Sequence, residues 1–497
     1  MTLSLVVEHF DDLLSTSEDV EQVNTFILQL ALQGKLVEQS VSDESGLELL
    51  QRIYAERTEN GKSTQLSPIK ESDKPFALPA GWAWARLGDI IQISSGKSLT
   101  KEQMNEAGKI PVYGGNGITG YHDEALVYQK TIVIGRVGFY CGSVHLTEDK
   151  AWVTDNAFIT TYPEKYIHRE YLIWLLRGTN LKENENATAQ PVISGRKVYP
   201  IIVGIPPLLE QKRIAARLEE LFAQTRALAK ELARSQSELD GLNKSALSHL
   251  LASETPEDFN QHWDFIAEHF DLLFQSPEHV APLRQSILEL AVRGKLTQDT
   301  HDWKTESLED ISSDADYGTS QKCDYGASDT PVLRIPNVAG GKINLDNLKH
   351  ATKPEELGKE KSLVPNDFLI VRTNGSKDLV GKGSVVMQEF DNATYFASYL
   401  IRYRLTNYGT WINIIWNSRL IRDQVEKIAA TSAGQYNVNI KNLNSIQIPI
   451  PPLAEQERIV KRVERLLSLC DALEARLQSA EEERGRLVAA VMSTVGG

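Results

Sequence analysis

Cysteine and long apolar runs are both scarce in this sequence. Its 497 residues include only Cys141, Cys323 and Cys470, a number and spacing that fit neither a disulfide framework nor a metal cluster. No stretch approaches the roughly 20 apolar residues that cross a bilayer. The amino terminus has no basic segment before its short apolar run, so it is unlike a signal peptide. We therefore expect a cytoplasmic protein without membrane spans or bound metal.

Motifs for catalysis on nucleotides are also missing. A methyltransferase acting on a base amino group needs Asn or Asp, then Pro-Pro and an aromatic residue, but both Pro-Pro pairs here stand in Ile-Pro-Pro-Leu. A P-loop needs a glycine five residues before Gly-Lys-Ser. The triplets that begin at Gly61 and Gly96 have Glu56 and Ile91 at that place. We expect no catalytic residues and no cofactor in this chain.

A basic surplus, the usual mark of a nucleic-acid-binding protein, is absent as well, since the net charge is -14. The acid is unevenly distributed. Residues 1–79 carry 6 basic and 14 acidic side chains, and residues 205–301 carry 10 and 15. Residues 80–204, with 13 against 12, and 302–449, with 17 against 18, are close to neutral. The charge therefore does not exclude a DNA contact by these two segments.

The sequence contains two internal repeats. Residues 8–37 match residues 268–297 with 14 identities in 30, and residues 205–222 match 450–467 with 11 in 18. Each repeat ends or begins with a helix signal, because Gly34 and Gly294 suit helix C-caps and a Pro-Pro pair suits a helix start. The repeats predict a duplicated architecture.

Apolar residues recur after each Pro-Pro pair at spacings of four and three, from Ile214 to Ala246 and from Ile459 to Leu487. This 3.5-residue period predicts long helices packed as coiled coils. One repeat unit is intact in the middle of the chain, and the other is split between its two ends. We therefore expect the terminal helices to meet in space, in a pseudo-two-fold arrangement of circularly permuted repeats.

The segments between the repeats alternate β-rich runs with glycine turns. The runs at 131–134, 368–371 and 399–404 predict strands, and helices are expected near 166–177 and 411–430. An additional amphipathic helix is expected within residues 38–79, with Leu47, Leu50, Ile53 and Tyr54 on one face. The predicted fold class is α+β, with two mixed α/β domains separated by long antiparallel coiled-coil-like helices.

This prediction divides the chain into five parts. They are an N-terminal helical region and linker (1–79), a first globular domain (80–204), a central helical region (205–301), a second globular domain (302–449) and a C-terminal helical region (450–497).

Together these features resemble the specificity subunit of type I restriction-modification enzymes over essentially the whole chain. The repeated Ile-Pro-Pro-Leu-x-Glu-Gln-x-Arg-Ile segments are similar to the repeated regions of that family. Pro-Val-Tyr-Gly-Gly-Asn-Gly-Ile at 111 and Leu-Arg-Ile-Pro-Asn at 333 are similar to parts of its target-recognition domains. The N-terminal helical region resembles the subgroup that carries an extension there.

The resemblance implies a non-catalytic reader of a bipartite target in double-stranded DNA. It further implies two methyltransferase subunits as partners, together with restriction and translocase subunits. These partners would bind S-adenosylmethionine, ATP and Mg²⁺. Two alternatives remain open at this point, a self-sufficient DNA-modifying enzyme and a helical adaptor whose domains bind protein.

Polar residues in the glycine-rich turns of both domains are the predicted DNA contacts, because Arg and Lys read guanine and Asn and Gln read adenine. For a single residue the alternative is a side chain that stabilises its own turn, and Arg136 and Arg372 in particular could brace the fold. The first-domain candidates are Lys97, Ser98, Tyr113, Asn116, Tyr121, Arg136, Asn156, Gln190, Ser194 and Arg196. The second-domain candidates are Lys322, Arg334, Asn337, Arg372, Asn374, Ser376, Lys377, Lys382, Gln435, Tyr436 and Asn439.

Overall fold

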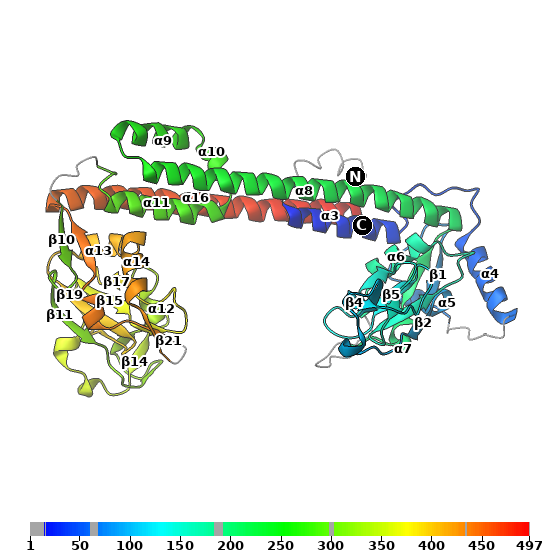
Figure 1. Ribbon diagram of the computed structural model, residues 1–497, viewed down its shortest axis with the longest axis horizontal. Helices are drawn as coiled ribbons and strands as arrows, with labels where there is room; N and C mark the ends of the chain where they lie inside the picture. Colours follow the sequence, from blue (N-terminus) through cyan, green and yellow to red (C-terminus); the bar gives the residue numbers. More distant parts are fainter. Residues whose placement is uncertain are drawn as a thin grey trace. The chain divides into compact units, whose positions relative to one another are not determined.

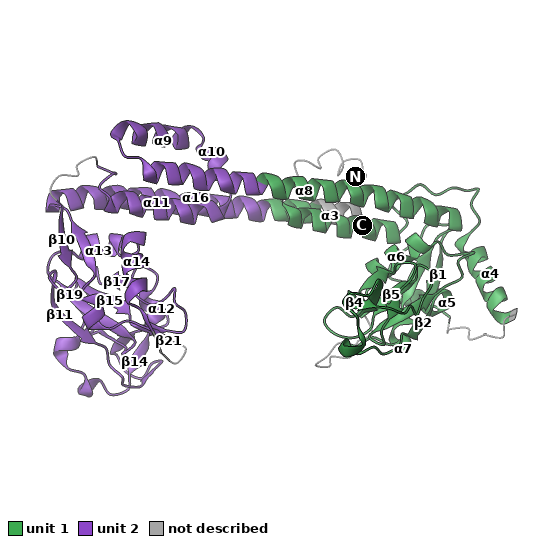
Figure 2. Cartoon of the chain, in the orientation of Figure 1, with its two compact units in different colours: residues 1–235, 484–497 green, residues 236–483 purple. Residues whose placement is uncertain are grey.

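A computed structural model of the chain describes residue 14 and residues 16–59, 68–182, 192–297, 303–432 and 435–496. The chain forms two compact units. Unit 1 comprises residues 1–235 and 484–497, and unit 2 comprises residues 236–483 (Figure 2). The last turns of the chain therefore belong to the same unit as its first helices, as the permuted repeat predicts.

The helices of unit 1 include segments from both ends of the sequence. Helix α3 (Ser17–Leu32) packs with the first half of α8 (Leu208–Ala252), where the Thr225 hydroxyl lies 2.6 Å from Asn24 Oδ1. The end of α16 (Leu453–Gly496) joins them, with Arg484 Nε 3.7 Å from the Asp19 carboxylate. The terminal repeats thus meet, which confirms the expected closure for the described residues.

The helices of unit 2 repeat this arrangement with the two long helices in exchanged roles. The first half of α16 packs with α11 (Val280–Val292), and Arg284 forms ion pairs with Asp471 at 2.6 Å and Glu474 at 2.8 Å. The end of α8 lies in the same core (Figure 1). Two helices, α9 (Pro256–Glu268) and α10 (Phe270–Leu273), and a 3₁₀ turn, η3 (Pro277–His279), connect α8 to α11.

Both predicted glycine caps are confirmed. Gly34 has φ +73° and Gly294 has φ +69°, a left-handed conformation that suits glycine. The amide after each glycine donates back into its helix, from Lys35 to the Leu30 carbonyl and from Lys295 to the Leu290 carbonyl, both at 2.9 Å. These bonds satisfy carbonyl groups that the helix end leaves without partners.

The heptad prediction holds over the first half of each long helix and again at the buried Ala246, and it fails at single positions farther along. Ile214, Leu218 and Val463 are buried, but Leu242 and Leu487 are exposed. A straight α-helix drifts by about 20° per heptad relative to a 3.5-residue repeat, so another face reaches the core. Asn243 is buried beside Leu242, and its side chain donates to the Leu273 carbonyl at 2.9 Å.

The predicted helix within residues 38–79 is α4 (Gly46–Glu59). Leu50 and Ile53 are buried, Tyr54 is half-buried, and Leu47 is exposed, so the expected apolar face was wrong at Leu47. Leu49 is buried instead. The linker that follows contains a 3₁₀ turn, η1 (Glu71–Asp73).

The first domain has two small sheets with strand orders β2-β8-β5-β6 and β4-β3-β7. Strand β3 pairs in parallel with β7, and the other pairs in these two sheets are antiparallel. Helix α6 packs against the edge strand β6 of the first sheet. The elements are β1 (Ala83–Arg86), α5 (Leu87–Ile90), β2 (Gln92–Ser95), η2 (Lys101–Gln103), β3 (Ile110–Gly114), β4 (Gly117–His122), β5 (Ile132–Gly135), β6 (Val144–Leu146), β7 (Trp152–Val153), β8 (Ala157–Thr161), α6 (Arg169–Gly178), α7 (Gly195–Val198) and β9 (Ile202–Ile205).

The second domain has the orders β11-β19-β15-β17, β12-β14-β13-β18 and β16-β21-β20. The expected helix at 411–430 is two helices, α13 and α14, interrupted at Trp416–Ser418. The elements are β10 (Lys304–Ser307), β11 (Ser312–Tyr317), β12 (Cys323–Asp324), β13 (Pro331–Leu333), α12 (Ile335–Val338), β14 (Lys349–Ala351), η4 (Pro354–Glu356), η5 (Lys359–Lys361), β15 (Asp367–Val371), β16 (Thr373–Asn374), β17 (Gly383–Val385), β18 (Tyr395–Phe396), β19 (Leu400–Leu405), α13 (Gly409–Ile415), α14 (Arg419–Ile428), β20 (Ala430–Ser432), β21 (Gln435–Asn437), α15 (Ile440–Leu443) and β22 (Gln447–Ile450).

The two domains share one core topology, which the second extends with β12 and the sheet β16-β21-β20. In each, the first and last strands form an antiparallel pair, with Ala83 opposite Ile205 and Lys304 opposite Ile450. The four-stranded sheets correspond strand for strand, and a parallel pair, β3-β7 or β13-β18, stands in each second sheet. The duplication detected in the helices therefore extends through the domains, although their sequences share little.

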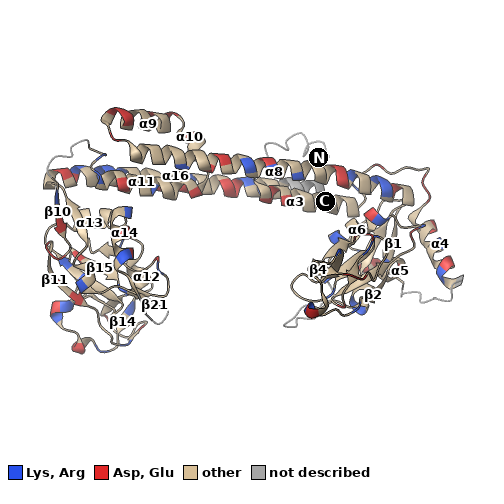
Figure 3. Ribbon diagram, in the orientation of Figure 1, with Lys and Arg blue, Asp and Glu red and all other residues tan. Residues whose placement is uncertain are grey.

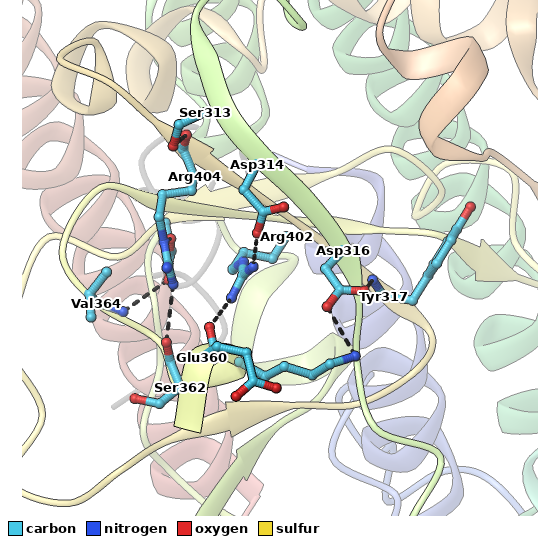
Figure 4. A network of polar contacts seen from close by, with 11 residues as sticks. Ser313, Asp314, Asp316, Tyr317, Glu360, Ser362, Val364, Arg402 and Arg404 are labelled. Carbon is cyan, nitrogen blue, oxygen red and sulfur yellow. Dashed lines mark hydrogen bonds and ion pairs between the residues drawn. The ribbon is translucent and has the colours of Figure 1, made fainter. Parts of the chain in front are cut away.

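Two arginines of β19 hold a segment that lengthens the second domain (Figure 4). Arg402 is buried, forms an ion pair with Asp314 and donates to the Glu360 carbonyl at 3.2 Å. Arg404 pairs with the buried Asp367 at 2.9 Å, and this hydrogen bond raises the pKa of Arg404. These bonds connect η5 and the residues after it to the main sheet.

No helix in the described part of the chain is long and apolar enough to cross a membrane.

Candidate nucleic-acid interface

Each domain places an arginine directly after a central strand of its main sheet, β5 in the first and β15 in the second. Arg136 follows β5, and its amide donates to the Asn156 carbonyl at 2.8 Å while its carbonyl accepts from Ile193 at 3.0 Å. Arg372 follows β15, donates to the Tyr399 carbonyl at 2.8 Å and accepts from Val438 at 2.9 Å. The two arginines therefore occupy the same backbone position, clamped on both sides.

Their side chains also have similar surroundings. The Arg136 guanidinium lies 5.4 Å from the Phe158 ring centre, and that of Arg372 lies 4.7 Å from the ring of Tyr317. Hydrogen bonds from these groups to Ser95, Asp155 and Ser398 are 3.4 Å long, near the limit for such bonds. The aromatic contacts position each guanidinium, and these long bonds use little of its donor capacity. Each arginine can therefore stabilise the fold and still have hydrogen-bond donors available for DNA.

The first-domain loop cluster surrounds Arg136. The Lys97 amide donates to the Val153 carbonyl at 2.9 Å, which fixes this residue beside the β7–β8 turn. Gly115 packs so closely that a Cβ there would lie 2.8 Å from the Val137 carbonyl oxygen. These contacts bring together Lys97, Asn116, Arg136, Asn156 and Ser194, with Ser98 next to Lys97. Most of their side chains are exposed.

Four first-domain candidates lie apart from this cluster or outside the description. Tyr113 is 5% exposed, and its hydroxyl points to the Leu146 carbonyl at 3.5 Å, so it belongs to the core. Tyr121 is exposed on β4, away from the β3–β4 turn. Arg196 is exposed on α7, close after Ser194. Gln190 lies outside the described residues.

The second-domain loop cluster surrounds Arg372. Strand β16 pairs with β21, and the Thr373 hydroxyl lies 3.2 Å from Gln435 Oε1. Asn439 caps α15 by accepting from the Asn442 amide at 2.8 Å. The cluster thus consists of Arg372, Asn374, Gln435, Tyr436 and Asn439. Three further candidates occupy the segment between β16 and β17, namely Ser376, Lys377 and Lys382.

These three have different surroundings. The Ser376 amide donates to Asn374 Oδ1 at 2.8 Å, which attaches it to the cluster. Lys377 pairs with Glu426 at 3.0 Å, a hydrogen bond that raises the pKa of Lys377 and lowers that of Glu426. Lys382 is half-buried, and its carbonyl accepts from the Val371 amide. A DNA phosphate at Lys377 would have to compete with the Glu426 carboxylate.

Lys322 and Arg334 line a hollow of about 410 Å³ in the second domain, which reaches Ser398 and Tyr399 beside Arg372. Lys349 lines it too, and the exposed Tyr325 ring lies 5.1 Å from the Lys349 ammonium and 5.8 Å from the Arg334 guanidinium. Asn337 is 2% exposed and donates to the Asn344 carbonyl at 2.9 Å, so it holds the fold below this hollow. The lining also includes Tyr399 and Asp324, and the Asp324 carboxylate pairs with Lys322 at 3.6 Å.

Sequence reasoning missed several residues in these places. Tyr399 stands where the first domain has Asn156 and is 44% exposed. Lys349 was missed because no glycine turn adjoins it, and Tyr325 was missed although Gly326 follows it. Phe139 and Tyr140, 81% and 54% exposed after Arg136, were also missed. Their position between Gly138 and Gly142 is the signal that could have identified them.

Comparisons with known proteins agree with this architecture. The family model of the type I restriction modification DNA specificity domain matches twice, at residues 79–234 and 300–482. The EcoEI and EcoAI type I restriction enzyme specificity subunits of Escherichia coli are each 24% identical, over 95% of this chain and 93% of theirs. A solved chain from a type I restriction-modification system covers 85% of this chain and 99% of its own, with 17% identity and a TM-score of 0.55.

The two family matches together span more than half of the chain, and each contains one of the α/β domains described above. The chain therefore belongs to the family of type I restriction-modification DNA specificity subunits and carries two recognition domains.

Proposed function

We propose that the two loop clusters read the two halves of a bipartite target in double-stranded DNA. The first-domain loop cluster reads one half through Arg136 and its neighbours, and the second-domain loop cluster reads the other through Arg372. Arg pairs with guanine through two hydrogen bonds, and Asn pairs in the same way with adenine. The exposed Asn116 and Asn156 and the half-buried Asn374 supply the second kind of contact.

The observation that carries this proposal is the equivalent position of Arg136 and Arg372 among different neighbours. Asn156 of the first domain corresponds to Tyr399 of the second, and Ser95, which pairs with Phe158, corresponds to Tyr317, which pairs with Ile401. The shared backbone with different side chains supports the proposal that the two domains recognise different DNA sequences. Because specificity comes from contacts to base edges, such differences change the target without changing the fold.

The chain acts as the non-catalytic scaffold of a cytoplasmic complex. Two methyltransferase subunits bind it and modify one adenine in each half of the target, and restriction and translocase subunits cut unmodified DNA. S-adenosylmethionine, ATP and Mg²⁺ are bound by these partners. Acidic and basic side chains are interspersed along α8 and α16 (Figure 3), which suits protein contacts more than a phosphate backbone.

The test is to combine the full chain with type I methyltransferase subunits and to sequence the methylated adenines in DNA exposed to the complex. We expect N6-methyladenine in both halves of a split sequence, and no methyl transfer by the chain alone. Methylation by the chain alone would instead identify a self-sufficient enzyme. Failure to form any such complex, or DNA affinity that is absent or insensitive to salt, would favour a protein-binding adaptor.

A further inference from the structure

The turn between β5 and β6 presents two aromatic rings to solvent. Phe139 is 81% exposed and Tyr140 is 54% exposed, and their ring centres lie 5.1 Å apart in an edge-to-face arrangement. Single exposed apolar residues are common on protein surfaces. Two adjacent aromatic rings at the tip of one turn are a larger feature, and we call residues 138–142 the aromatic tip.

Backbone hydrogen bonds and a buried anchor hold the aromatic tip in shape. Gly138 has φ +89° and Gly142 has φ +86°, conformations that favour glycine. The Cys141 amide donates to the Gly138 carbonyl at 3.0 Å, and the Gly142 amide donates to that of Gly135 at 2.7 Å. The Cys141 side chain is 3% exposed and packs in the core. The rings are therefore presented on a preorganised support, which limits the entropy lost on binding.

Two cationic residues adjoin the backbone of the aromatic tip. Lys182 Nζ donates to the Phe139 carbonyl at 3.3 Å, and Arg136 begins the same turn. The aromatic tip is thus continuous with the first-domain loop cluster, which we have assigned to base edges. A ligand that meets an arginine, a lysine and two exposed rings at once must offer both negative charge and flat apolar faces. Duplex DNA has both, in its phosphates and in its base pairs.

We propose that Phe139 inserts into a base-pair step of the first half of the target and unstacks it, with Tyr140 supporting the ring. This inference rests on the proposed function. Apolar side chains that enter a duplex in this way separate neighbouring base pairs and bend the DNA. Recognition of the first half then depends partly on how easily its sequence deforms, in addition to direct contacts.

The second domain has no such device in the corresponding segment. Residues 373–382, between β15 and β17, contain Asn374, Ser376 and Lys377 but no aromatic residue. The inferred distortion is therefore confined to one half of the target. Unstacking by an aromatic side chain is therefore a property of the first domain and is not shared by the second.

The experiment uses the full chain assembled with methyltransferase subunits and duplexes that contain the target defined by the methylation map. Each position of the first half carries 2-aminopurine in turn, a base whose fluorescence rises when it is unstacked. We expect a rise at one or two adjacent positions other than the methylated adenine. Phe139→Ala should abolish this rise and weaken target affinity about 10-fold, since stacking on an aromatic side chain contributes about 1–3 kcal/mol per base.

Phe139→Leu should retain most of the signal, because leucine also serves as an apolar wedge. Tyr128→Ala is the matched control, since Tyr128 is 71% exposed but precedes β5 at its other end, and it should change neither quantity. The 2-aminopurine signal at the methylated adenine reports the action of the partners and should survive in every variant.

Unchanged fluorescence and affinity in Phe139→Ala, on a target that is still bound and methylated, would overturn the inference and leave the proposed function intact. Weaker affinity with an unchanged fluorescence pattern would also overturn it, because the ring would then bind DNA without unstacking a step. Absence of any DNA binding by the wild-type complex would overturn both.

Discussion

The two recognition domains have the same strand order in their main sheets and differ at the loop clusters proposed to contact DNA. The first ends its central strand in a short turn with the exposed Phe139 and Tyr140. The second continues from Arg372 into β16 and its partner β21, a polar ladder, and adds a segment held by Arg402 and Arg404. The comparison teaches that the backbone frame is shared while the side chains proposed to contact DNA differ.

Close backbone contacts explain how the two domains keep the same core fold although few of their residues are identical. A Cβ at Gly96 would lie 2.2 Å from the Val153 carbonyl oxygen, and one at the equivalent Gly318 would lie 2.2 Å from that of Ala397. Most other positions of the sheets accept any apolar residue of suitable size. Little more than these glycines and the repeated ends of the domains therefore has to match in sequence.

The largest expected effect comes from these glycines. Gly96→Ala should destabilise the first domain and Gly318→Ala the second, each by about 3 kcal/mol, because the added methyl group meets rigid backbone. Urea unfolding followed by hydrogen exchange in each domain measures both. Gly241→Ala is the control, since nothing lies within 4 Å of its Cβ and alanine favours its helix by about 1 kcal/mol. If only one of the two variants were destabilised, Gly96 and Gly318 would not be structurally equivalent.

The next largest expected effect is on DNA binding, and it tests whether each domain recognises its own half of the target. Arg136→Ala should weaken binding by about 1–3 kcal/mol and relax the sequence preference in one half of the target only. Arg372→Ala should do the same in the other half. Binding assays with targets altered in one half at a time distinguish the two. Equal relaxation of both halves by either variant would show that the domains do not read separately.

A smaller difference is expected where each domain meets its helices. Trp82 Nε1 donates to Glu210 at 2.9 Å, whereas the buried Trp303 Nε1 finds no hydrogen-bond partner among the described residues. Trp82→Phe should therefore lower the free energy of unfolding by about 1 kcal/mol more than Trp303→Phe does. Chemical denaturation of the two variants checks this. Equal losses would mean that the two joints are energetically alike.

The smallest effect is a difference in acid sensitivity. Burial, with a smaller contribution from Arg177, lowers the pKa of His145 below its usual 6.5. The unfolded chain then binds the proton more readily, so this contribution to stability is complete above pH 6.5 and is lost as the pH falls below it. The second domain has Ser384 at the same register position. Hydrogen exchange at pH 7 and pH 5 should show a greater loss in the first domain, and His145→Gln should remove that excess.

Much of the fold was predictable because repeats and periodicity record it directly. The long helices, the caps at Gly34 and Gly294, and the strands β5, β15 and β19 follow from local patterns. The shared topology of the domains did not, because its hydrogen bonds join backbone groups and leave few marks in the sequence. The break between α13 and α14 was also missed, since both helices continue one apolar pattern.

The predicted DNA-contact residues fall into a clustered group and a buried group for a physical reason. Lys97, Asn116, Arg136 and Asn156 lie together because glycine-rich turns gather at one end of β5. Tyr113 and Asn337 are buried because each sits where a strand or short helix turns its side chain inward. Nearness to glycine does not reveal that direction. The role of every candidate in DNA binding remains a prediction.

The most direct test of separate reading is a chain in which residues 302–449 replace residues 80–204, so that both positions carry the second domain. Sequencing the adenines methylated by its complex measures the new target. The equivalent arginines and the pseudo-two-fold repeat of the sequence predict a symmetric target, in which the half read by the second domain occurs twice in opposite orientations. Retention of the original first half, in a complex that still methylates DNA, would contradict the account.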